Sequence, residues 1–489
     1  MSGSVDAKAL PEAGREEEEI LEEMRALREE DVNWHDGKVW SLVFHASDEL
    51  AAFSKQAYGM FYAENGLNPT AFPSLRRFEV EVISMVAKLL GGDLQVVGNM
   101  TSGGTESILM AVKAAREWGR KRGKSDPEMV LPMSAHPAFE KAAHYFGVKA
   151  VHVPVRKDFR VDLRAMRKAI NRRTVLLVGS APQYPQGVVD PIEEIAQLAQ
   201  RRKLLCHVDA CVGGMMLPFV RDLGHQVPAF DFAVPGVTSM SVDLHKYGYA
   251  AKGASIVLYR DAELRKHQYF AYTEWPGGIY VSPTMTGTRP GGAIAAAWAM
   301  LNRLGLSGYR EIARDVMAAA GRIRAGVAEI EGVDVLGEPT MSVMALGSKT
   351  LDIYEVGDAL AERGWHLDRQ QNPASLHLTI NAAHLESTEQ LLADLREAAE
   401  LCQRPPTERL IQRSKLLLVN TAMRVLPGPV ATKVTRVASR VLGIGDGELP
   451  KKTAAMYGLM AALPNKGDLN EMVIELLDKL TRHEGSTPA

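Results

Sequence analysis

The chain has 489 residues, of which 46% are hydrophobic and 24% charged, and its formal net charge is −2. It is long enough for one large domain and a smaller one, and its balanced charge excludes a protein that attracts nucleic acid through its net field. The three cysteines, Cys206, Cys211 and Cys402, are too few and too unevenly spaced for a disulfide framework or a zinc site. We therefore expect no metal and a reducing, cytoplasmic environment.

The first 30 residues show a glutamate-rich helical pattern and contain no apolar core of the kind that a signal peptide needs. No run of 18 apolar residues occurs in the chain, so no membrane-spanning helix is expected. Together these features predict an intracellular, soluble protein.

From about residue 75, helical and strand-like stretches alternate. Apolar residues at helical spacing predict helices over residues 76–90, 107–121 and 190–203, and short apolar runs followed by turn residues predict strands over 129–134, 149–155, 174–181 and 204–210. This alternation favours an α/β fold with a mostly parallel sheet covered by helices. Active sites in such sheets lie where strands end and loops begin.

After about residue 300 the pattern changes to that of a small α+β domain. Residues 403–450 differ again, because the "PGP" at 427–429 separates two helical stretches, and residues 403–452 contain 10 Lys and Arg against 3 Asp and Glu. A basic amphipathic hairpin of this kind can lie on an anionic membrane surface. It can equally pack on the partner subunit of a dimer, and the sequence leaves both interpretations open.

Three stretches carry candidate chemistry. "TSGGTES" (101–107) precedes a predicted helix, where glycines and free N–H groups favour a phosphate, although such loops are often only caps. "HVDA" (207–210) places Asp209 at the end of an apolar strand, as a helix cap or a partner for a cation. "SVDLHKYG" (241–248) places Lys246 after a strand, where a lysine with a lowered pKa can form a Schiff base with a carbonyl.

In combination, these stretches meet the three needs of pyridoxal phosphate. The cofactor requires an amine that binds its aldehyde, a carboxylate that keeps its ring nitrogen protonated, and a cradle for its phosphate. Each signal is weak alone. Lys246, Asp209 and the glycine loop at strand or helix ends in this order make a strong combination.

Longer stretches show that the chain resembles the group II pyridoxal-phosphate decarboxylase family, and within it the branch of lyases that cleave phosphorylated sphingoid bases. The resemblance rests on "SAHPAFEKAAHYFGVK" (134–149), "PQYPQGVVDP" (182–191), "LLCHVDACVGG" (204–214), "GVTSMSVDLHKYGYAAKGASIVLYR" (236–260) and "GGIYVSPTMTGTRPGG" (277–292). It runs from about residue 34 to 402 and resumes at 451–473. The basic stretch 403–450 lies outside it.

The resemblance implies the fold type I of pyridoxal-phosphate-dependent transferases, with a mostly parallel seven-stranded sheet in the large domain and a smaller α+β C-terminal domain. It implies a homodimer with active sites at the subunit interface. The expected organisation is an N-terminal helical segment that contributes to the dimer and the active site (1–75), a large cofactor-binding domain (76–300), a small domain (301–402 and 451–489) and a basic helical insertion (403–450).

The resemblance also implies roles for individual residues. Lys246 would be the Schiff-base lysine, Asp209 would pair with the pyridinium nitrogen, and His136 would stack on the ring, which makes these three the expected catalytic residues. The further cofactor-binding residues implied are Gly104, Thr105, His207 beside Asp209, His245 and, from the neighbouring subunit, Thr288.

The substrate-binding positions depart from the pattern of the lyases. Where the lyases carry a tyrosine, this chain has Phe44, followed by His45; where they carry a phosphate-binding histidine, it has Asn68. Phenylalanine cannot donate a hydrogen bond and asparagine cannot carry a charge. The other expected substrate-binding residues are retained: Asn65, Tyr184, Lys252 and Tyr280.

These residues support three hypotheses. The first is a pyridoxal-phosphate-dependent lyase that cleaves the C2–C3 bond of a phosphorylated sphingoid base such as sphingosine 1-phosphate, giving a fatty aldehyde and phosphoethanolamine, with peripheral membrane contact through residues 403–450. The second, favoured by Phe44 and Asn68, is an amino-acid decarboxylase or a lyase for a different amine on the same scaffold. The third is a cofactor-binding scaffold without activity, which the presence of Lys246, Asp209 and His136 disfavours.

Overall fold

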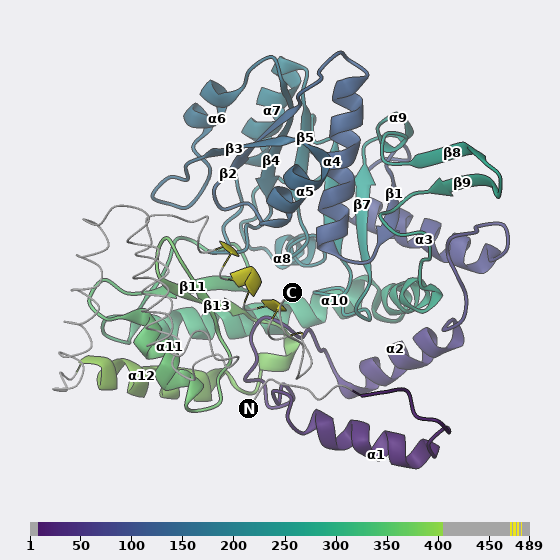
Figure 1. Cartoon of the computed structure of the whole chain (residues 1–489). Coiled ribbons are helices and arrows are strands. Elements are labelled where there is room, and N and C mark those ends of the chain that lie inside the picture. The colour runs from purple at the N-terminus through teal and green to yellow at the C-terminus, as the bar shows by residue number, and fades with distance from the viewer. Residues whose placement is uncertain (1–7, 404–469, 472, 476, 479–480, 482–489) are drawn as a thin grey trace.

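The computed structural model describes residues 8–403 and, beyond them, residues 470, 471, 473–475, 477, 478 and 481. Apart from residue 403, the predicted basic insertion lies outside the described residues, as does most of the predicted C-terminal part of the small domain (451–489). The described chain forms a large domain, a small domain and a projecting two-stranded arm (Figure 1).

The large domain is built on a seven-stranded sheet with the order β1-β7-β6-β5-β4-β2-β3. The pairs β2–β3, β2–β4, β4–β5 and β5–β6 are parallel, and β7 is antiparallel to both of its neighbours, β1 and β6. The predicted mostly parallel sheet is therefore confirmed. Its strands are Val97–Thr101 (β1), Glu128–Pro132 (β2), Lys149–Val153 (β3), Thr174–Ser180 (β4), Leu205–Asp209 (β5), Ser239–Asp243 (β6) and Ser255–Tyr259 (β7).

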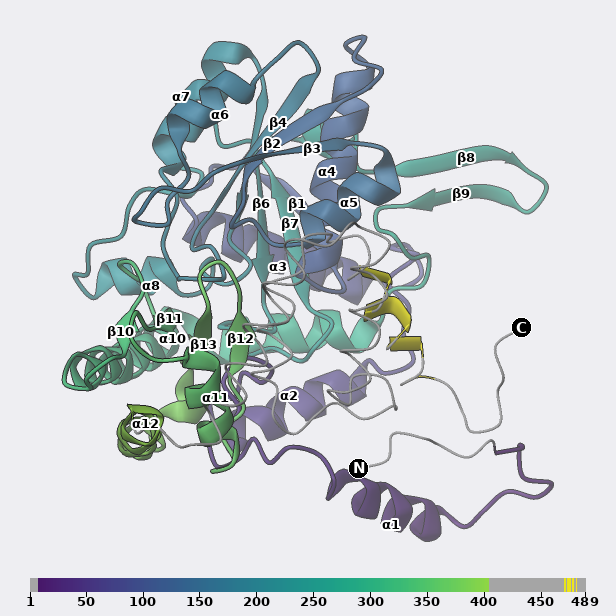
Figure 2. The same ribbon diagram turned by 60° about the vertical axis from the view of Figure 1, so that its left-hand side comes forward.

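Helices cover the sheet, whose central strands are buried on both faces. Every residue of β4, β5, β6 and β7 is buried, which requires packing on each side. Figures 1 and 2 show the helices flanking the sheet. They are Pro73–Leu89 (α3), Gly104–Arg120 (α4), Ala138–Phe146 (α5), Leu163–Ala169 (α6), Ile192–Arg202 (α7), Leu217–Asp222 (α8) and Ala262–Arg265 (α9).

The strand register brings the carboxyl ends of three strands to one edge of the sheet. Thr101 at the end of β1 and Asp243 at the end of β6 both pair with Ser255, the first residue of β7. Asp209 at the end of β5 pairs with Ser241 of β6. The side chains that follow these strands therefore gather at a single edge, as the sequence predicts.

The small domain follows a long helix, Gly291–Ala328 (α10), which is interrupted at Gly305, where φ is 55°. The predicted domain boundary at residue 300 thus falls inside α10, close to this interruption. Beyond it lies a four-stranded sheet with the order β10-β11-β13-β12. The elements of the small domain are Asp334–Val335 (β10), Val343–Gly347 (β11), Ile353–Ala361 (α11), Asp368–Gln370 (β12), Ser375–Thr379 (β13), the 3₁₀ helix Ala382–His384 (η1) and Thr388–Gln403 (α12).

The N-terminal region contains two helices, Glu17–Arg28 (α1) and Asp48–Met60 (α2), and the segment between them crosses the small domain. Trp40 N donates to His366 O at 3.2 Å, and Thr379 N donates to Trp40 O at 3.0 Å. His384 Nε2 lies 2.8 Å from Val39 O. This segment, residues 37–44, is held by backbone bonds to residues of the small domain more than 300 positions further along the chain, and Phe44 is its last residue.

The arm consists of strands Phe270–Trp275 (β8) and Gly278–Ser282 (β9), and both views show it projecting from the large domain (Figures 1 and 2). Its side chains are largely exposed although many are apolar, with Trp275 54% and Ile279 76% exposed. At its base, Lys113 Nζ donates to the carbonyls of His267, Gln268 and Tyr269 at 2.8–2.9 Å. Among the described residues, no helix is both long and apolar enough to cross a membrane.

Candidate active site

Lys246 lies in the turn after β6, and about a quarter of its side chain (26%) is exposed. Its Nζ is 2.9 Å from Oδ2 of Asp243, a carboxylate that is 2% exposed. Burial alone would lower the pKa of Lys246, but the Asp243 carboxylate more than offsets it and leaves the pKa raised. Burial in turn favours a higher pKa for Asp243, and the charge of Lys246, together with the neighbouring His245, reverses this and lowers it. The two groups form an ion pair.

Asp209 ends the neighbouring strand β5 and is held by one of its two oxygens. Its Oδ1 accepts hydrogen bonds from Cys211 N and Ser241 Oγ, both at 3.1 Å. His207 lies behind it, with Nδ1 2.9 Å from Ser239 Oγ and Nε2 3.2 Å from Ser241 Oγ. Because Ser241 donates to Asp209, His207 Nε2 donates to Ser241, so this histidine orients the aspartate through a serine. No described residue donates a hydrogen bond to Asp209 Oδ2, which leaves that atom available.

His136 lies just before α5, where its Nδ1 accepts a hydrogen bond from Ala138 N at 3.1 Å. Burial lowers its pKa, the charge of Asp209 opposes this effect, and Lys246 adds to it. The imidazole is therefore neutral at pH 7. A neutral imidazole can stack on another ring. The charges of Asp209 and Lys246 therefore both act on His136.

The glycine loop and His245 line a second part of the same edge. A Cβ atom on Gly103 would meet only His245 Cε1, at 4.0 Å, so the space above this glycine is open. Gly104 begins the 17-residue helix α4, whose first N–H groups have no partner within the helix. His245 Nδ1 donates to Ala254 O at 2.8 Å, which aims its Nε2 away from that carbonyl. Thr105, also in this first turn, is exposed.

The loop is fixed from below by groups that the sequence analysis did not single out. Glu106 is buried, and its two carboxylate oxygens accept from Ser102 N at 2.6 Å and from Met285 N at 2.8 Å. Ser107 Oγ lies 2.6 Å from Thr101 Oγ1 and 2.8 Å from the hydroxyl of a serine on β7. These bonds tie the glycine loop both to the sheet and to the loop that carries Thr288.

Comparison with known proteins decides the family. The model of the pyridoxal-dependent decarboxylase conserved domain matches residues 3–347. The chain belongs to the pyridoxal-dependent decarboxylase family. It is 41% identical over 478 residues to the sphingosine-1-phosphate lyase of Oryza sativa subsp. japonica, covering 96% of this chain and 81% of the relative. It is 44% identical to the enzyme of that name from Arabidopsis thaliana, covering 94% of this chain and 79% of the relative.

Solved structures agree with this result. The sphingosine-1-phosphate lyase of Burkholderia pseudomallei K96243 superposes with a TM-score of 0.79 at 40% identity, covering 86% of this chain and 98% of that one. The glutamate decarboxylase of Lactobacillus brevis superposes with a TM-score of 0.73 at 18% identity, covering 82% and 96% of the two chains, which shows the fold alone. The predicted fold type I and the pyridoxal phosphate cofactor are thus confirmed.

The residues at this edge fit the family cofactor. Gly103 leaves open space beside His245 for a phosphate, and Asp209 Oδ2 is free to face a protonated ring nitrogen. The amine of Lys246 is partly exposed beside them. His136 is neutral, and the charges of Asp209 and Lys246 both influence its pKa. The site therefore has a suitable residue for each part of the cofactor: Lys246 for the aldehyde, Asp209 for the pyridine nitrogen, and the open space at Gly103 for the phosphate.

Phe44 and Lys252 are brought together next to this region. Lys252 Nζ lies 5.6 Å from the centre of the Phe44 ring and donates to Leu42 O at 3.0 Å. The Phe44 ring packs edge-on against Tyr247, with centroids 5.1 Å apart. Burial, and secondly the charge of Lys246, lower the pKa of Lys252. The protein therefore has a cation, Lys252, near the candidate active site. The neighbouring Phe44 offers this cation an aromatic ring but no hydroxyl.

Asn65 and Thr288 also lie together, within one chain. Asn65 Nδ2 donates to Thr288 Oγ1 at 3.3 Å, and Asn65 Oδ1 accepts from Arg289 N at 3.1 Å. Asn68 has a different environment: its Oδ1 accepts from Thr70 N, Thr70 Oγ1 and a neighbouring amide at 2.7–3.2 Å. Asn68 thus stabilises its own turn, and its substrate-binding role stays a prediction.

Tyr184 is tied to the small domain. Its hydroxyl donates to Asp368 Oδ2 at 2.8 Å, and its ring stacks on His377 with centroids 3.9 Å apart. Burial, together with the Asp368 carboxylate, raises the pKa of Tyr184, so the phenol stays protonated. Tyr280, by contrast, lies on strand β9 of the projecting arm, in register with Tyr272 of β8. Both views show this arm extending away from the large domain (Figures 1 and 2).

The sequence analysis missed four polar groups that position these residues: Asp243, Glu106, Asp368 and His377. Asp243 stands in the stretch "SVDLHKYG" at a strand end, three residues before the lysine, and that position was a usable signal. Glu106 follows the glycine loop in the first turn of a helix, where an acidic residue is also a common helix-capping choice. Asp368 and His377 gave no local signal, because they meet Tyr184 only through the tertiary fold.

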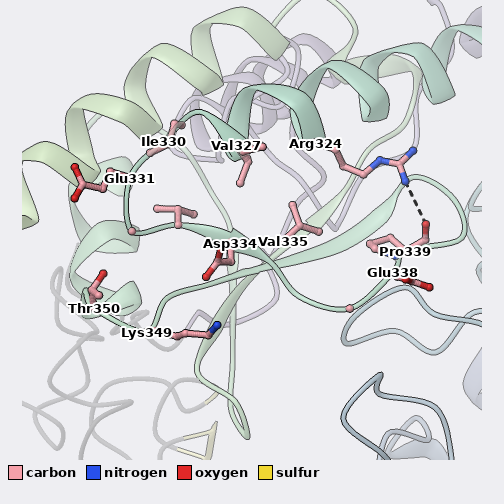
Figure 3. Close-up of a pocket in the computed structure, with 14 residues that line it drawn as sticks. Arg324, Val327, Ile330, Glu331, Asp334, Val335, Glu338, Pro339, Lys349 and Thr350 are labelled. Atoms are coloured by element: carbon pink, nitrogen blue, oxygen red, sulfur yellow. Dashed lines mark hydrogen bonds between the residues drawn. The ribbon is translucent and has the colours of Figure 1, made fainter.

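An open groove in the small domain is separate from this site (Figure 3). It lies between the end of α10 and strand β10, and its apolar side includes Val327, Ile330 and Val335. Arg324 reaches across it and donates to Pro339 O at 3.3 Å. Of the described residues that line this groove, none is a predicted site residue, so we assign it no part in the chemistry.

Proposed function

We propose that this protein is a pyridoxal-phosphate-dependent lyase that cleaves the C2–C3 bond of a phosphorylated sphingoid base, giving a fatty aldehyde and phosphoethanolamine. The support comes from relatives named sphingosine-1-phosphate lyase, of which the chain covers 81% and 79% at 41–44% identity. The observation that carries the proposal is that Asp209 and the ion pair of Lys246 with Asp243 stand at the ends of the neighbouring strands β5 and β6, at one edge of the sheet.

Pyridoxal phosphate, when bound, supplies an aldehyde that attaches to amines and a ring that takes up the electron pair of a broken bond. In the proposed site, Lys246 provides the attaching amine, and Asp209 Oδ2 holds a proton on the ring nitrogen. His136 supports the ring from one face. Gly104, Thr105 and His245 hold the phosphate at the start of α4.

The substrate phosphate would be bound mainly by Lys252. This ammonium is exposed at the edge of the site, so a dianion brought near it replaces water with a charge-assisted hydrogen bond. Tyr184 gives its single hydroxyl hydrogen to Asp368, so in the proposed site it would contact the substrate through its ring. Asn65 and Tyr280 complete the set of proposed substrate contacts.

A second candidate, a decarboxylase or a lyase for a different amine, is favoured by Phe44 and Asn68. Phe44 presents no hydroxyl to a phosphate, and the Asn68 oxygen is already engaged in its own turn. The same cofactor serves both reactions, and the orientation of the substrate decides which bond breaks.

Product analysis separates these candidates. Purified protein loaded with pyridoxal phosphate is incubated with sphingosine 1-phosphate and, separately, with a panel of amino acids, and the products are identified by mass spectrometry. We expect a long-chain aldehyde and phosphoethanolamine in equal amounts from the lipid. Release of CO₂ from an amino acid without aldehyde from the lipid would reject the lyase in favour of the decarboxylase.

We further propose a homodimer in which the arm packs on the second copy. Support comes from the exposed apolar side chains of β8 and β9, which a partner chain of the same kind would cover. In this arrangement Tyr280 and Thr288 are supplied to the neighbouring site. Replacing both Trp275 and Ile279 with serine should convert a dimer to monomers in sedimentation analysis. The matched control is Leu94→Ser, which removes a fully exposed leucine outside the arm.

The basic segment 403–450 lies almost wholly outside the described residues, and its membrane role is a separate proposal. We propose a cytoplasmic protein that contacts anionic membranes peripherally through this segment, on the basis of its excess of Lys and Arg over acidic residues. Deleting residues 403–450 should reduce co-sedimentation with phosphatidylserine vesicles. Unchanged vesicle binding would favour packing of this segment on the partner subunit.

A further inference from the structure

Asp243 is a buried carboxylate whose surroundings are not explained by packing alone. It is the last residue of β6, and its Oδ2 lies 2.9 Å from Lys246 Nζ. Its other oxygen, Oδ1, is buried and has no hydrogen bond of good geometry among the described residues, since the nearby Ser255 hydroxyl donates to Val242 O. Burying an ionised carboxylate with one unsatisfied oxygen is unfavourable, so its presence beside the lysine calls for a functional explanation.

The carboxylate lies directly beneath the glycine loop. A Cβ atom on Gly104 would come within 2.8 Å of both Asp243 oxygens, so the absence of a side chain at Gly104 leaves the room that the carboxylate occupies. Gly104 is also the first residue of α4, and the amino-terminal end of a helix favours a nearby negative charge. Asp243 therefore stays ionised, enclosed between a helix end and an ammonium group.

Several other ionisable groups face Lys246, but the structure places only Asp243 within ion-pair distance of Nζ among the described residues. These other groups are Asp209 at the end of β5, Cys211 after it, His136 before α5, His245 and Lys252 after β6, and His377 on β13. The Cys211 thiol and the three histidines are neutral near pH 7, because burial raises the pKa of the thiol and lowers the pKa of each histidine.

We propose that Asp243 is a positioning residue that holds Lys246 as an ammonium ion whenever this lysine is not attached to the cofactor. The inference rests on the proposed role of Lys246 as the attachment residue. An ammonium nitrogen has no lone pair, so a lysine held in this way stays aimed at the site but does not compete with the substrate amine for the aldehyde.

The attachment reaction then requires a deprotonation first. The Lys246 ammonium gives one proton to solvent, its nitrogen forms a double bond to the aldehyde carbon, and the aldehyde oxygen leaves as water with the two remaining protons. By stabilising the ammonium, Asp243 sets the pH at which this sequence can begin. It acts through Lys246 and not on the substrate, so its effect is visible before any turnover.

The test measures the amine of Lys246 in cofactor-free protein. An amine-acetylating reagent is applied between pH 6 and 11, and modification of the Lys246 peptide is quantified by mass spectrometry. In the wild type we expect half-maximal reactivity above the pH of about 10.4 that is typical of lysine. In Asp243→Asn, where Asp209 is the remaining carboxylate that opposes the effect of burial, we expect Lys246 to react at least about tenfold faster at pH 8. Attachment of added pyridoxal phosphate, followed by absorbance, should accelerate by a similar factor.

The matched control is Asp231→Asn, which removes a buried carboxylate of the same domain that is paired at 3.0 Å with Arg221. It should leave the reactivity of Lys246 unchanged. Identical pH profiles for wild type and Asp243→Asn would overturn the proposal. If Asp243→Asn does not fold, the pH profile of Lys246 acetylation in the wild type tests the proposal by itself. A midpoint of this profile below that of ordinary lysines would contradict the proposed effect of the ion pair.

A separate measurement keeps this proposal distinct from the proposed function. Borohydride reduction of the cofactor-loaded protein, followed by peptide mapping, identifies the lysine that carries the cofactor. Attachment at a lysine other than Lys246 would refute the assigned role of Lys246 and with it the function of the ion pair. Attachment at Lys246 with an unshifted labelling profile would refute the role of Asp243 alone.

Discussion

The cofactor end and the substrate end of the site are built differently. At the cofactor end, Asp209 and Asp243 are the last residues of buried parallel strands, and Lys246 follows within one turn. At the substrate end, Phe44 and Asn68 lie in loops of the N-terminal region. Strand ends are fixed by the register of the whole sheet, whereas these loops are fixed by bonds to distant parts of the chain.

This difference indicates which part of the site determines the reaction type and which part determines the choice of substrate. In the proposed function, the reaction type would depend on groups that the sheet holds in place, such as Asp209, which is oriented by His207 through Ser241. The choice of substrate depends on loops whose residues can change without disturbing the sheet, as Phe44 illustrates. Variants at the two ends should therefore fail in different ways.

The largest effect is expected at the cofactor end. Lys246→Ala removes the amine that is proposed to attach the cofactor, so turnover should fall on the order of 10³-fold or more. The absorption band of bound cofactor should disappear with it, which is checked by spectroscopy of protein loaded with pyridoxal phosphate. A variant that turned over at the wild-type rate would show that the chemistry resides elsewhere.

At the substrate end, Lys252→Met should weaken binding and leave the chemical step largely intact. Loss of a charge-assisted hydrogen bond to a phosphate should raise KM for a phosphorylated substrate by about 10- to 100-fold. The control is Lys157→Met, an exposed lysine in the large domain. An equal fall in kcat with an unchanged KM would place Lys252 in the cofactor end instead.

Acid should destabilise both ends through three buried histidines. Burial lowers the pKa of His207, His377 and His384 to about 4, below the value of about 6.5 in an unfolded chain. Because the unfolded state binds more protons between these values, the stability is fully present above pH 6.5. It falls by about 1 kcal/mol per histidine for each pH unit down to about pH 4.

Denaturant unfolding at a series of pH values checks this expectation. Replacing His377 with glutamine should flatten the decline in the small domain, and the corresponding change at His207 should do so in the large domain. A free energy of unfolding that stays constant between pH 6.5 and 4.5 would contradict the neutral, buried state of these rings.

The smallest effect is expected from Asn68→Ala. The variant removes three hydrogen bonds that hold an exposed turn, so the free energy of unfolding should fall by about 1 kcal/mol while KM stays the same. Thermal unfolding and steady-state kinetics are measured on the same preparation. A raised KM at unchanged stability would instead support the predicted contact between Asn68 and the substrate.

The cofactor end could be predicted from sequence because its residues stand at strand ends within short motifs. Lys246, Asp209 and the glycine loop each follow an apolar run, and the parallel sheet then brings such ends to one edge. Asp243 was equally visible in the same motif. Its meaning became clear only when the structure placed its oxygen 2.9 Å from the lysine nitrogen.

The substrate end could not be predicted to the same depth. Tyr184 was found through its motif, but its partner Asp368 lies 184 residues away and no local pattern links the two. Asn68 was interpreted through its resemblance to a phosphate-binding position, and its hydrogen bonds within its own turn are set by backbone conformation. Contacts made only by tertiary packing leave no periodic trace in a sequence.

The segment of residues 37–44 has a consequence for how the protein is made. A ribosome releases this segment early, yet its backbone partners, His366 and Thr379, emerge more than 300 residues later. Leu42, whose carbonyl binds Lys252, therefore cannot take its place until the last described strand has formed. Synthesis must therefore pass residue 379 before the substrate end can assemble.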